Sequence, residues 1–301
     1  MIKYTYIKKT EIYMYHIIVN PTGGKGKSLK ALGKVEALLK KNGAEYTIHK
    51  TEYAGHATEI ARELSQTPDT KIIAMGGDGS FHEVLCGIDN FDNVTLGLIA
   101  CGSGNDFIKK SGHSANIEEA VATILKDKPS YVDYMELGKY RCLNVGGGGM
   151  DVDVLLKYAQ CKTLKGKAAY YYSLFYTLCH TRFHHLRITA DGVTKDASVF
   201  MIGVGNGGFI GGGIPICPNA VVDDGLLNVG YVNEMKKSKI LSRLIKFLKG
   251  KHVGTDWGGE YTAKKITIEA LDDSRFELDG EIIDDTKLDI EVVHGKLKMY
   301  R

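Results

Sequence analysis

Proline and tryptophan are scarce in this chain, and long apolar runs are missing from it. Its 301 residues include 5 prolines and 1 tryptophan but 36 glycines, so we expect glycine to form most of the turns. No apolar run approaches the ~18 residues that a membrane-spanning helix needs. The first residues scatter charges among tyrosines and lack the apolar core of a signal peptide. The sequence therefore predicts neither a transmembrane helix nor a secretory leader.

The cysteine pattern and the charge exclude further classes of protein. Six cysteines show neither a CxxC pair nor a disulfide-framework spacing, and we interpret them as reduced thiols, mostly in the core of a cytoplasmic protein. The net charge of +3 is too small to indicate a nucleic-acid-binding protein. With 44% hydrophobic and 25% charged residues, the composition is that of a globular chain long enough for two domains.

Residues 14–133 are predicted to form an α/β domain with a parallel sheet. Four apolar runs typical of strands alternate with four segments of helical periodicity. The strand-like runs are YHIIVN, EYTIHKT, KIIAM and TLGLIA, and the helical segments are SLKALGKVEALLKKNG, HATEIARELS, SFHEVLCGI and NIEEAVATILKDK. Helices of this length between strands favour a parallel sheet covered on both faces. Residues 1–13 are interpreted as an extension, with Met14 as a candidate native start.

Residues 134–301 differ from the first domain in their sequence pattern and are predicted to form a mainly β domain. Glycine clusters occur in NVGGGGMDVDV and GVGNGGFIGGG, and strand-like runs such as ASVFMIGVG, KKITIEA and KLDIEVV dominate. Helical periodicity is confined to two passes, near 164–182 and 236–250. The C-terminal tail is a candidate for packing back onto the first domain.

Three glycine-rich turns follow predicted strands of the first domain. They read NPTGGKGKS, GGDGS at 76–80, and CGSGNDF. Parallel strands end at a common sheet edge, where glycine lets a ligand approach the main chain and helix N-termini offer N–H groups to phosphate. Asp78 beside a phosphate further suggests an intervening cation. The first turn fails the Walker A pattern at Pro21, and none completes GxGxxG, so tight turns without a ligand remain the alternative.

Six motifs, taken together, carry a family resemblance. IIVNPTGGKG, TEYAGHATEIA, MGGDGSFHEVL, CGSGNDF, PNAVVDDGLLNV and LDGE occur in this order over nearly the whole chain. This combination resembles the diacylglycerol kinase catalytic-domain family, specifically its bacterial soluble lipid kinases, to which sphingosine kinases are related. The resemblance implies an N-terminal α/β domain of the NAD kinase/diacylglycerol kinase type, a C-terminal β-sandwich, and a cleft between them. It also implies ATP as donor, Mg²⁺, and a hydroxyl of a membrane lipid such as diacylglycerol as acceptor.

The resemblance also assigns roles to particular residues. Contacts to ATP are implied for Asn20, Pro21, Thr22, Gly23, Gly24, Thr51, Gly77, Asp78, Gly79, Ser80 and Ser103. The metal-associated loop is implied at Val221, Asp224 and Leu226, with a carboxylate from Asp224 and main-chain oxygens from the other two. Because hard cations take oxygen ligands, Asp78, Asp224 and Asp279 are also candidates for one network of Mg²⁺ and water.

The segment RFELDGEII supplies the candidate base. Residues two apart in an extended chain point the same way, so we expect Asp279 and Glu281 to reach one cleft together. The family places its essential carboxylates here, and we favour Glu281 as acceptor of the hydroxyl proton, with Asp279 as its partner and Asp78 next in line. The alternative is a hairpin turn with solvated acids, because Asp-Gly is a strong turn signal.

Three positions depart from the family pattern. Ser80 and Ser103 stand where threonine is commoner, and both keep a hydroxyl. His82 replaces the asparagine usual in bacterial members and matches sphingosine-type members, which leaves the lipid open. We interpret His82 as a histidine on the helix surface rather than a catalytic one.

A basic amphipathic segment, KKSKILSRLIKFLKGK at 236–251, points to the membrane. It carries seven basic residues and no acid, and its apolar residues can share one helical face. Such a helix can dock on an anionic membrane, which implies a peripheral position at the inner face, or it can pack on the core with a solvated basic face.

Several choices stay open at this point. The acceptor can be diacylglycerol, a sphingoid base, an undecaprenyl-type alcohol or phosphatidylglycerol. An NAD kinase and a non-catalytic nucleotide-binding regulator are the competing functions, and a homodimer is an open possibility.

Overall fold

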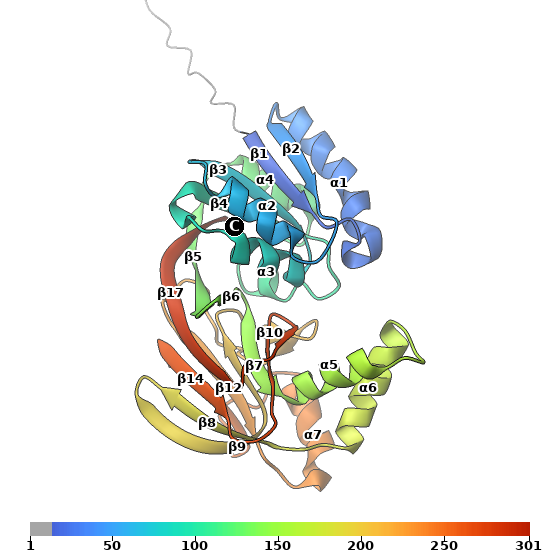
Figure 1. Cartoon of the computed structure of the whole chain (residues 1–301), viewed down its shortest axis with the longest axis vertical. Coiled ribbons are helices and arrows are strands. Elements are labelled where there is room, and N and C mark those ends of the chain that lie inside the picture. Colours follow the sequence, from blue (N-terminus) through green and yellow to red (C-terminus); the bar gives the residue numbers. More distant parts are fainter. Residues whose placement is uncertain (1–13) are drawn as a thin grey trace, which may run out of the picture.

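The computed structural model describes residues 14–301, and the interpretation of residues 1–13 as an extension lies outside this range. The first half of the chain alternates strands with helices, as its sequence periodicity predicts (Figure 1). These elements are β1 Met14–Val19, α1 Gly23–Lys41, β2 Glu45–Lys50, α2 His56–Leu64, β3 Thr70–Gly76, α3 Asp78–Gly87, β4 Val94–Ala100 and α4 Ile117–Leu125. Two short 3-10 helices, Phe91–Asn93 and Phe107–Lys109, flank β4.

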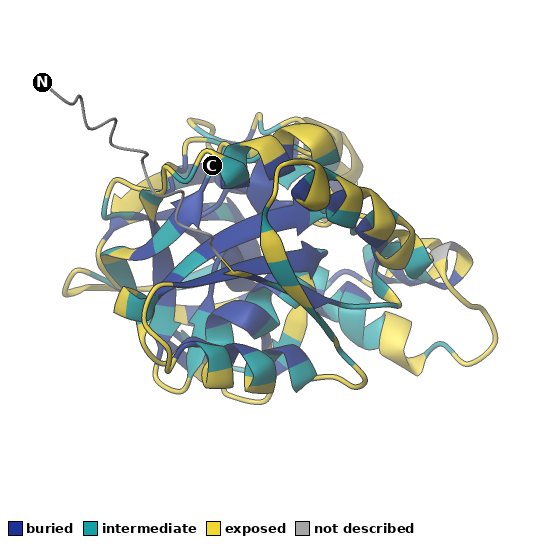
Figure 2. Ribbon diagram, turned by 90° about the horizontal axis from the view of Figure 1, so that it is seen from above, coloured by how far each residue is buried: buried dark blue, intermediate teal, exposed yellow. Residues whose placement is uncertain are grey.

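The first domain is a parallel sheet between two helical layers, which confirms the predicted fold class. Strands β4, β3, β1 and β2 pair in this order, all parallel. Successive side chains of a strand face opposite sides of the sheet, so both sides need apolar residues. On β1, Ile17 and Val19 face the core under α1 and α4, while Ile18 packs in the core under α2 and α3. Seen from above, the strands are buried and the outer faces of the helices are exposed (Figure 2).

The second domain is mainly β, again as predicted. Its strands are β5 Ser130–Leu137, β6 Tyr140–Cys142, β7 Val145–Gly149, β8 His184–Ala190, β9 Val193–Gly205, β10 Phe209–Ile210, β11 Ile214–Pro215, β12 Leu227–Asn233, β13 Gly258–Ala263, β14 Lys265–Ala270, β15 Phe276–Leu278, β16 Glu281–Ile283 and β17 Lys287–Tyr300. Its helices are α5 Met150–Gln160, α6 Lys167–Cys179 and α7 Lys237–Phe247, which lie together to one side of the strands in Figure 1. Among residues 14–301, no helix is long and apolar enough to cross a membrane.

Strand β17 belongs to both domains. It pairs with β14 and β5 on its way out of the second domain, and its last residues add to the parallel sheet beside β4, with Lys298 opposite Thr95. The proposed division between residues 133 and 134 falls inside β5, so no linker separates the domains there. One hydrogen-bonded sheet network therefore runs from the second domain into the first.

Helix α5 has no counterpart among the predicted elements. It begins directly after the four glycines that end β7, and its first residues, MDVDV, alternate polar and apolar side chains in the manner of a strand. Val152 and Val154 are both buried, which the helix achieves by packing against α6 on one side and β9 on the other. Tertiary packing has thus overridden a local strand-like pattern.

Candidate active site

The three glycine turns meet at one edge of the parallel sheet. Gly24 has a left-handed backbone (φ +57°), and a Cβ there would lie 1.9 Å from the carbonyl oxygen of Cys101. A Cβ on Gly102 would lie 2.6 Å from Cα of Gly77. Only glycine permits such contacts between backbones, so the turns at 23–26, 76–80 and 101–104 are packed directly on one another. The predicted convergence of the turns is confirmed.

The first of these turns is held by its own side chains. Oδ1 of Asn20 accepts hydrogen bonds from the main-chain N–H groups of Thr22 and Gly23, at 3.0 and 3.1 Å, and from the Thr22 hydroxyl. Gly24, Lys25 and Gly26 are all left-handed, so the regular part of α1 begins only after them. The turn is therefore shaped before any ligand arrives.

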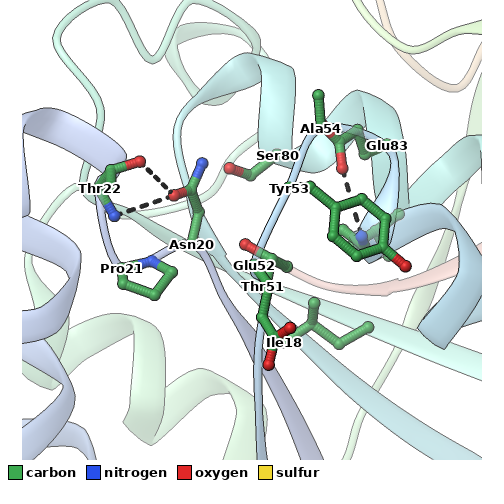
Figure 3. Close-up of a pocket in the computed structure, with 12 residues that line it drawn as sticks. Ile18, Asn20, Pro21, Thr22, Thr51, Glu52, Tyr53, Ala54, Ser80 and Glu83 are labelled. Carbon is green, nitrogen blue, oxygen red and sulfur yellow. Dashed lines mark hydrogen bonds between the residues drawn. The ribbon is translucent and has the colours of Figure 1, made fainter.

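A cavity of about 280 Å³, the first cavity, opens beside this edge (Figure 3). Asn20, Pro21, Thr22, Thr51 and Ser80, which were all predicted to contact ATP, line it. The other predicted contacts, Gly23, Gly24, Gly77, Asp78, Gly79 and Ser103, belong to the packed turns next to it and do not line it. Two further wall residues, Tyr53 and Glu83, were not predicted, because no local pattern marks either as a ligand contact. The ring of Tyr53 stacks on His56 with centroids 4.6 Å apart and presents an exposed aromatic face.

A second cavity, of about 240 Å³, lies on the other side of α3 and between the domains. Much of its wall is apolar and comes from the three helices of the second domain and from β10 and β11. These apolar residues are Met150, Val154, Leu155, Leu174, Ile210, Ile214, Leu244, Phe247 and Leu248. Five carboxylates also line the cavity, those of Asp78, Asp106, Asp151, Glu277 and Asp279, and none of its lining residues is basic.

The carboxylates of the second cavity differ in whether a hydrogen-bond donor or a cation offsets their negative charge. Oδ1 of Asp78 accepts a hydrogen bond from the Phe107 N–H at 3.2 Å, yet burial raises the pKa of Asp78 above its ordinary value. Burial likewise raises the pKa of Asp151 to about 6 and that of Glu277 well above its ordinary value. Asp106 is paired with Lys109 and accepts the Gly212 N–H at 2.7 Å. Asp78 is therefore a carboxylate that holds a proton more readily than a solvated one.

The expectation that Asp279 and Glu281 share one cleft is wrong. Asp279 (φ +52°) and Gly280 (φ +91°) form a two-residue hairpin turn, and Leu278 pairs with Glu281 across it. The alternation of an extended strand does not continue through such a turn, so the two carboxylates part. Asp279 lines the second cavity, whereas Glu281 is exposed in an outer groove with His82, Lys139 and Tyr140. Asp279 is also not a solvated turn residue, because its side chain is only 2% exposed.

The interpretation of His82 as a surface histidine is also wrong. Its side chain is 15% exposed, and Nδ1 lies 3.0 Å from Oδ2 of Asp279. Burial alone would lower the pKa of His82, but the hydrogen bond and the charge of Asp279 outweigh it and raise the pKa to about 11. His82 and Asp279 are thus an ion pair between the two domains.

The predicted metal-associated loop lies apart from the second cavity. Asp224 is exposed, and its Oδ1 accepts the Leu226 N–H at 3.0 Å. The buried Asp133 braces the loop by accepting the Gly225 N–H at 2.7 Å. Within residues 14–301 no three acidic, histidine or cysteine side chains form a metal-binding group, so Asp78, Asp224 and Asp279 are not gathered as direct ligands of one ion, and their network with Mg²⁺ and water stays a prediction. One carboxylate with main-chain oxygens is a donor set that suits Mg²⁺, which usually keeps several waters.

Comparison with known proteins gives two family matches. Residues 14–137 match the model of the diacylglycerol kinase catalytic domain, and residues 145–301 match that of the YegS C-terminal NAD kinase beta sandwich-like domain. A diacylglycerol kinase of Staphylococcus saprophyticus is 30% identical over 270 residues, and one of Bacillus subtilis is 27% identical over 268 residues; in each case 88% of both chains is covered. The fold also matches a crystal structure of a Bacillus anthracis str. Sterne protein that is described as a diacylglycerol kinase. The TM-score is 0.78 at 27% identity, over 97% of this chain and 98% of that one.

We expect Glu277 to make the protein less stable as the pH rises. The folded chain keeps a proton on Glu277 that the unfolded chain releases near its ordinary pKa of 4.5. The folded state therefore binds more protons above that pH, and this group lowers the free energy of unfolding by up to about 1.4 kcal/mol per pH unit. Glu277→Gln removes this slope between pH ~5 and ~6, as measured by urea denaturation.

Glu45→Gln, at an exposed position, is the matched control and should keep the slope of the unsubstituted protein. Equal slopes for Glu277→Gln and the unsubstituted protein would mean that Glu277 is ionised in the folded state.

Proposed function

The chain belongs to the diacylglycerol kinase catalytic-domain family and is a lipid kinase, and we propose that it transfers the γ-phosphate of ATP to the hydroxyl of an uncharged membrane lipid such as diacylglycerol. We assign ATP to residues 14–133 and the lipid to residues 134–301. The observation that carries this proposal is the position of α3 between two cavities, one with many polar side chains and one that is largely apolar. Ser80, Glu83 and Val84 line the first cavity, and Asp78, at the start of the same helix, lines the second.

Support for ATP comes from the glycine turns and the first cavity. Phosphoryl transfer needs a cradle for the phosphates more than it needs covalent chemistry. The packed turns leave main-chain N–H groups and the N-terminus of α3 free of side-chain bulk, and such groups bind phosphate. The exposed ring of Tyr53 at the first cavity is a surface on which an adenine base can stack.

Support for an uncharged lipid comes from the second cavity. Its apolar residues suit an acyl chain, and none of its lining residues is a basic side chain that would bind an anionic headgroup such as that of phosphatidylglycerol. A neutral hydroxyl lipid needs no such basic partner. A sphingoid base, whose amine is cationic, is the second candidate on the same charge argument.

Asp78 is our candidate for the acceptor of the hydroxyl proton. The lipid oxygen forms a bond to the γ-phosphorus, the bond from that phosphorus to the ADP oxygen breaks, and the hydroxyl proton passes to the Asp78 carboxylate. The raised pKa of Asp78 and its place on the second cavity fit this role. Glu281 lies outside that cavity, and Asp279 is occupied by other donors, so we no longer favour either as the base. Mg²⁺ would supply charge compensation to the phosphates, and Asp224 with the main-chain oxygens of Val221 and Leu226 would hold a further ion in the loop that lies apart from the second cavity.

Turnover of ATP with a lipid panel tests the function. We expect labelled phosphate to pass to diacylglycerol in vesicles, with less transfer to a sphingoid base and none to phosphatidylglycerol. Gly77→Val should lose Mg-ATP binding in calorimetry by at least about tenfold, because a Cβ there already approaches Cα of Gly102 at 3.0 Å.

Gly33→Ala is the matched glycine control, since a Cβ on Gly33 meets nothing within 4 Å. Transfer to NAD, or ATP binding without any acceptor, would replace the lipid kinase proposal by one of its competitors. Normal ATP affinity of Gly77→Val would contradict the cradle.

Asp78→Asn should lower kcat by about 10² or more, as expected for loss of a general base. Asn keeps the shape of the side chain and an oxygen for the Phe107 N–H, so ATP affinity and folding should change little. Glu281→Gln should keep kcat within about threefold, because Glu281 lies in the outer groove. The reverse order of effects, measured on the lipid identified above, would return the base to Glu281.

The membrane is the place where we expect this reaction to occur. Helix α7 buries Ile240 and Phe247 but leaves Leu241 and Ile245 exposed by 69% and 53%, so it presents a second apolar strip beside its basic residues. Leu248 is both exposed and part of the second cavity, which brings the strip to the lipid site. On α6, Tyr171, Tyr172 and Phe175 are exposed as well. Aromatic, leucine and lysine side chains in this combination suit an anionic bilayer surface.

Replacing Lys236, Lys237 and Lys239 by Gln should weaken sedimentation with anionic vesicles at low salt by roughly 10²-fold, since each juxtamembrane cation contributes about 1 kcal/mol. The same charge change at Lys30, Lys40 and Lys41 on α1 is the control and should leave sedimentation nearly unaltered. Binding that ignores both salt and the α7 lysines would contradict docking through this helix.

A further inference from the structure

The ion pair between His82 and Asp279 joins two parts of the chain that the proposed reaction needs to hold together. His82 comes from α3 in the first domain, and Asp279 comes from the turn between β15 and β16 in the second. Both side chains are withdrawn from solvent, at 15% and 2% exposure. A buried pair of this kind is weak evidence for added stability, so a reason for its presence has to be sought in the site.

Both carboxylate oxygens of Asp279 already accept hydrogen bonds from within the protein, so neither is available to a substrate. Three successive main-chain N–H groups donate to its carboxylate, those of Leu143, Asn144 and Val145, at 2.9, 3.0 and 3.2 Å. The Cys142 thiol lies 3.1 Å from Oδ1, and His82 takes Oδ2. A carboxylate offers about four lone-pair sites, and five donors surround this one. Asp279 therefore fixes the segment 142–145, of which Asn144 and Val145 line the second cavity.

The position of His82 on α3 relates this segment to the proposed base. Asp78 and His82 are four residues apart on one helix, so their side chains lie one turn apart on the same face. Asp78 lines the second cavity from the first domain, and the segment held by Asp279 lines it from the second. The ion pair thus sets the distance between the two walls of the cavity.

His82 itself does not carry protons for the acceptor. It lines the outer groove rather than the second cavity, and its Nε2 faces the Cys86 thiol at 3.6 Å. Burial would raise the pKa of Asp279, but the hydrogen bond and charge of His82 together with the main-chain N–H groups hold it below its ordinary value. The titratable and charged groups around the pair are Asp78 and Cys86 on α3, Cys142 on β6, Asp151 on α5, Glu277 on β15, and, in the outer groove, Lys139, Tyr140, Glu281, Asp284 and Asp285.

We propose that His82 is a positioning residue for phosphoryl transfer, whose charged ring holds Asp279, and through it the wall segment 142–145, at a fixed distance from Asp78. The proposal rests on the proposed function only for its kinetic consequences. Its structural content, protection of the 143–145 main-chain N–H groups by an ion pair, is independent of which acceptor is used.

His82→Ala and His82→Asn separate the roles of charge and hydrogen bond. His82→Ala should lower kcat by about 10- to 100-fold, the cost of a misplaced reacting group, with KM for ATP within about twofold because the first cavity is untouched. His82→Asn keeps an N–H donor without the charge and should recover kcat only in part, and only above neutral pH. In His82→Asn the acidic limb of kcat should move up by about one pH unit, since a buried Asp279 without its cation takes up a proton more readily. In an Asp279→Asn background, His82→Asn should leave that limb where it is.

His185→Asn, at an exposed position on β8, is the matched histidine control and should alter neither kcat nor the pH profile. Hydrogen exchange measures directly how well the ion pair protects the N–H groups of Leu143, Asn144 and Val145. Their exchange should be at least tenfold faster in His82→Ala than in the unsubstituted protein. Unchanged exchange, or an acidic limb that stays in place in His82→Asn, would overturn the proposal. Faster exchange in a protein that transfers no phosphate to any lipid would keep the ion-pair role and reject the proposed function instead.

Discussion

Compensation of one buried negative charge holds the cleft together. The Asp279 carboxylate is almost without water, and such a charge is costly unless donors and a cation replace its hydration. The main-chain N–H groups of residues 143–145, where β7 begins, and the ring of His82 supply that replacement. Because His82 lies on the helix that begins in the GGDG turn, the same compensation ties the glycine turns of the first domain to the cavity of the second.

Strand β17 is the other connection, and it is of a different kind. It is hydrogen-bonded to β14 and β5 in the second domain and to β4 in the first, so its register is set on both sides. A slip by one residue would turn its buried face, with Leu297 and Met299, towards the wrong side of the sheet. The domains are thus joined by a strand that cannot slide and by an ion pair whose strength depends on charge.

What the sequence predicted well was local or repeated. Strands and helices of the first domain follow from their periodicity, and three glycine turns after parallel strands had to meet because such strands end at one edge. The pairing of His82 with Asp279 links positions 197 residues apart, and no local pattern reports a contact of that separation. The sequence did offer the Asp-Gly hairpin as an alternative, and this hairpin is what turns Glu281 away from the second cavity. Asp151 and Glu277 gave no signal, because each alternates with apolar neighbours as a solvated strand residue would.

The two buried acids make sense when the cavity is considered as a whole. An apolar wall alone would admit any acyl chain, and a protein gains nothing in stability by burying Asp151, whose pKa is raised to about 6, and a protonated Glu277 inside it. Protonated, Glu277 carries no charge and can donate a hydrogen bond inside the apolar wall, where an ionised carboxylate could only accept one. The first cavity, on the far face of α3, is lined by hydroxyl, amide and aromatic groups together with the carboxylates of Glu52 and Glu83. One helix therefore separates a cavity with many polar side chains, beside the glycine turns, from a largely apolar cavity, and the proposed function places ATP in the first and the lipid in the second.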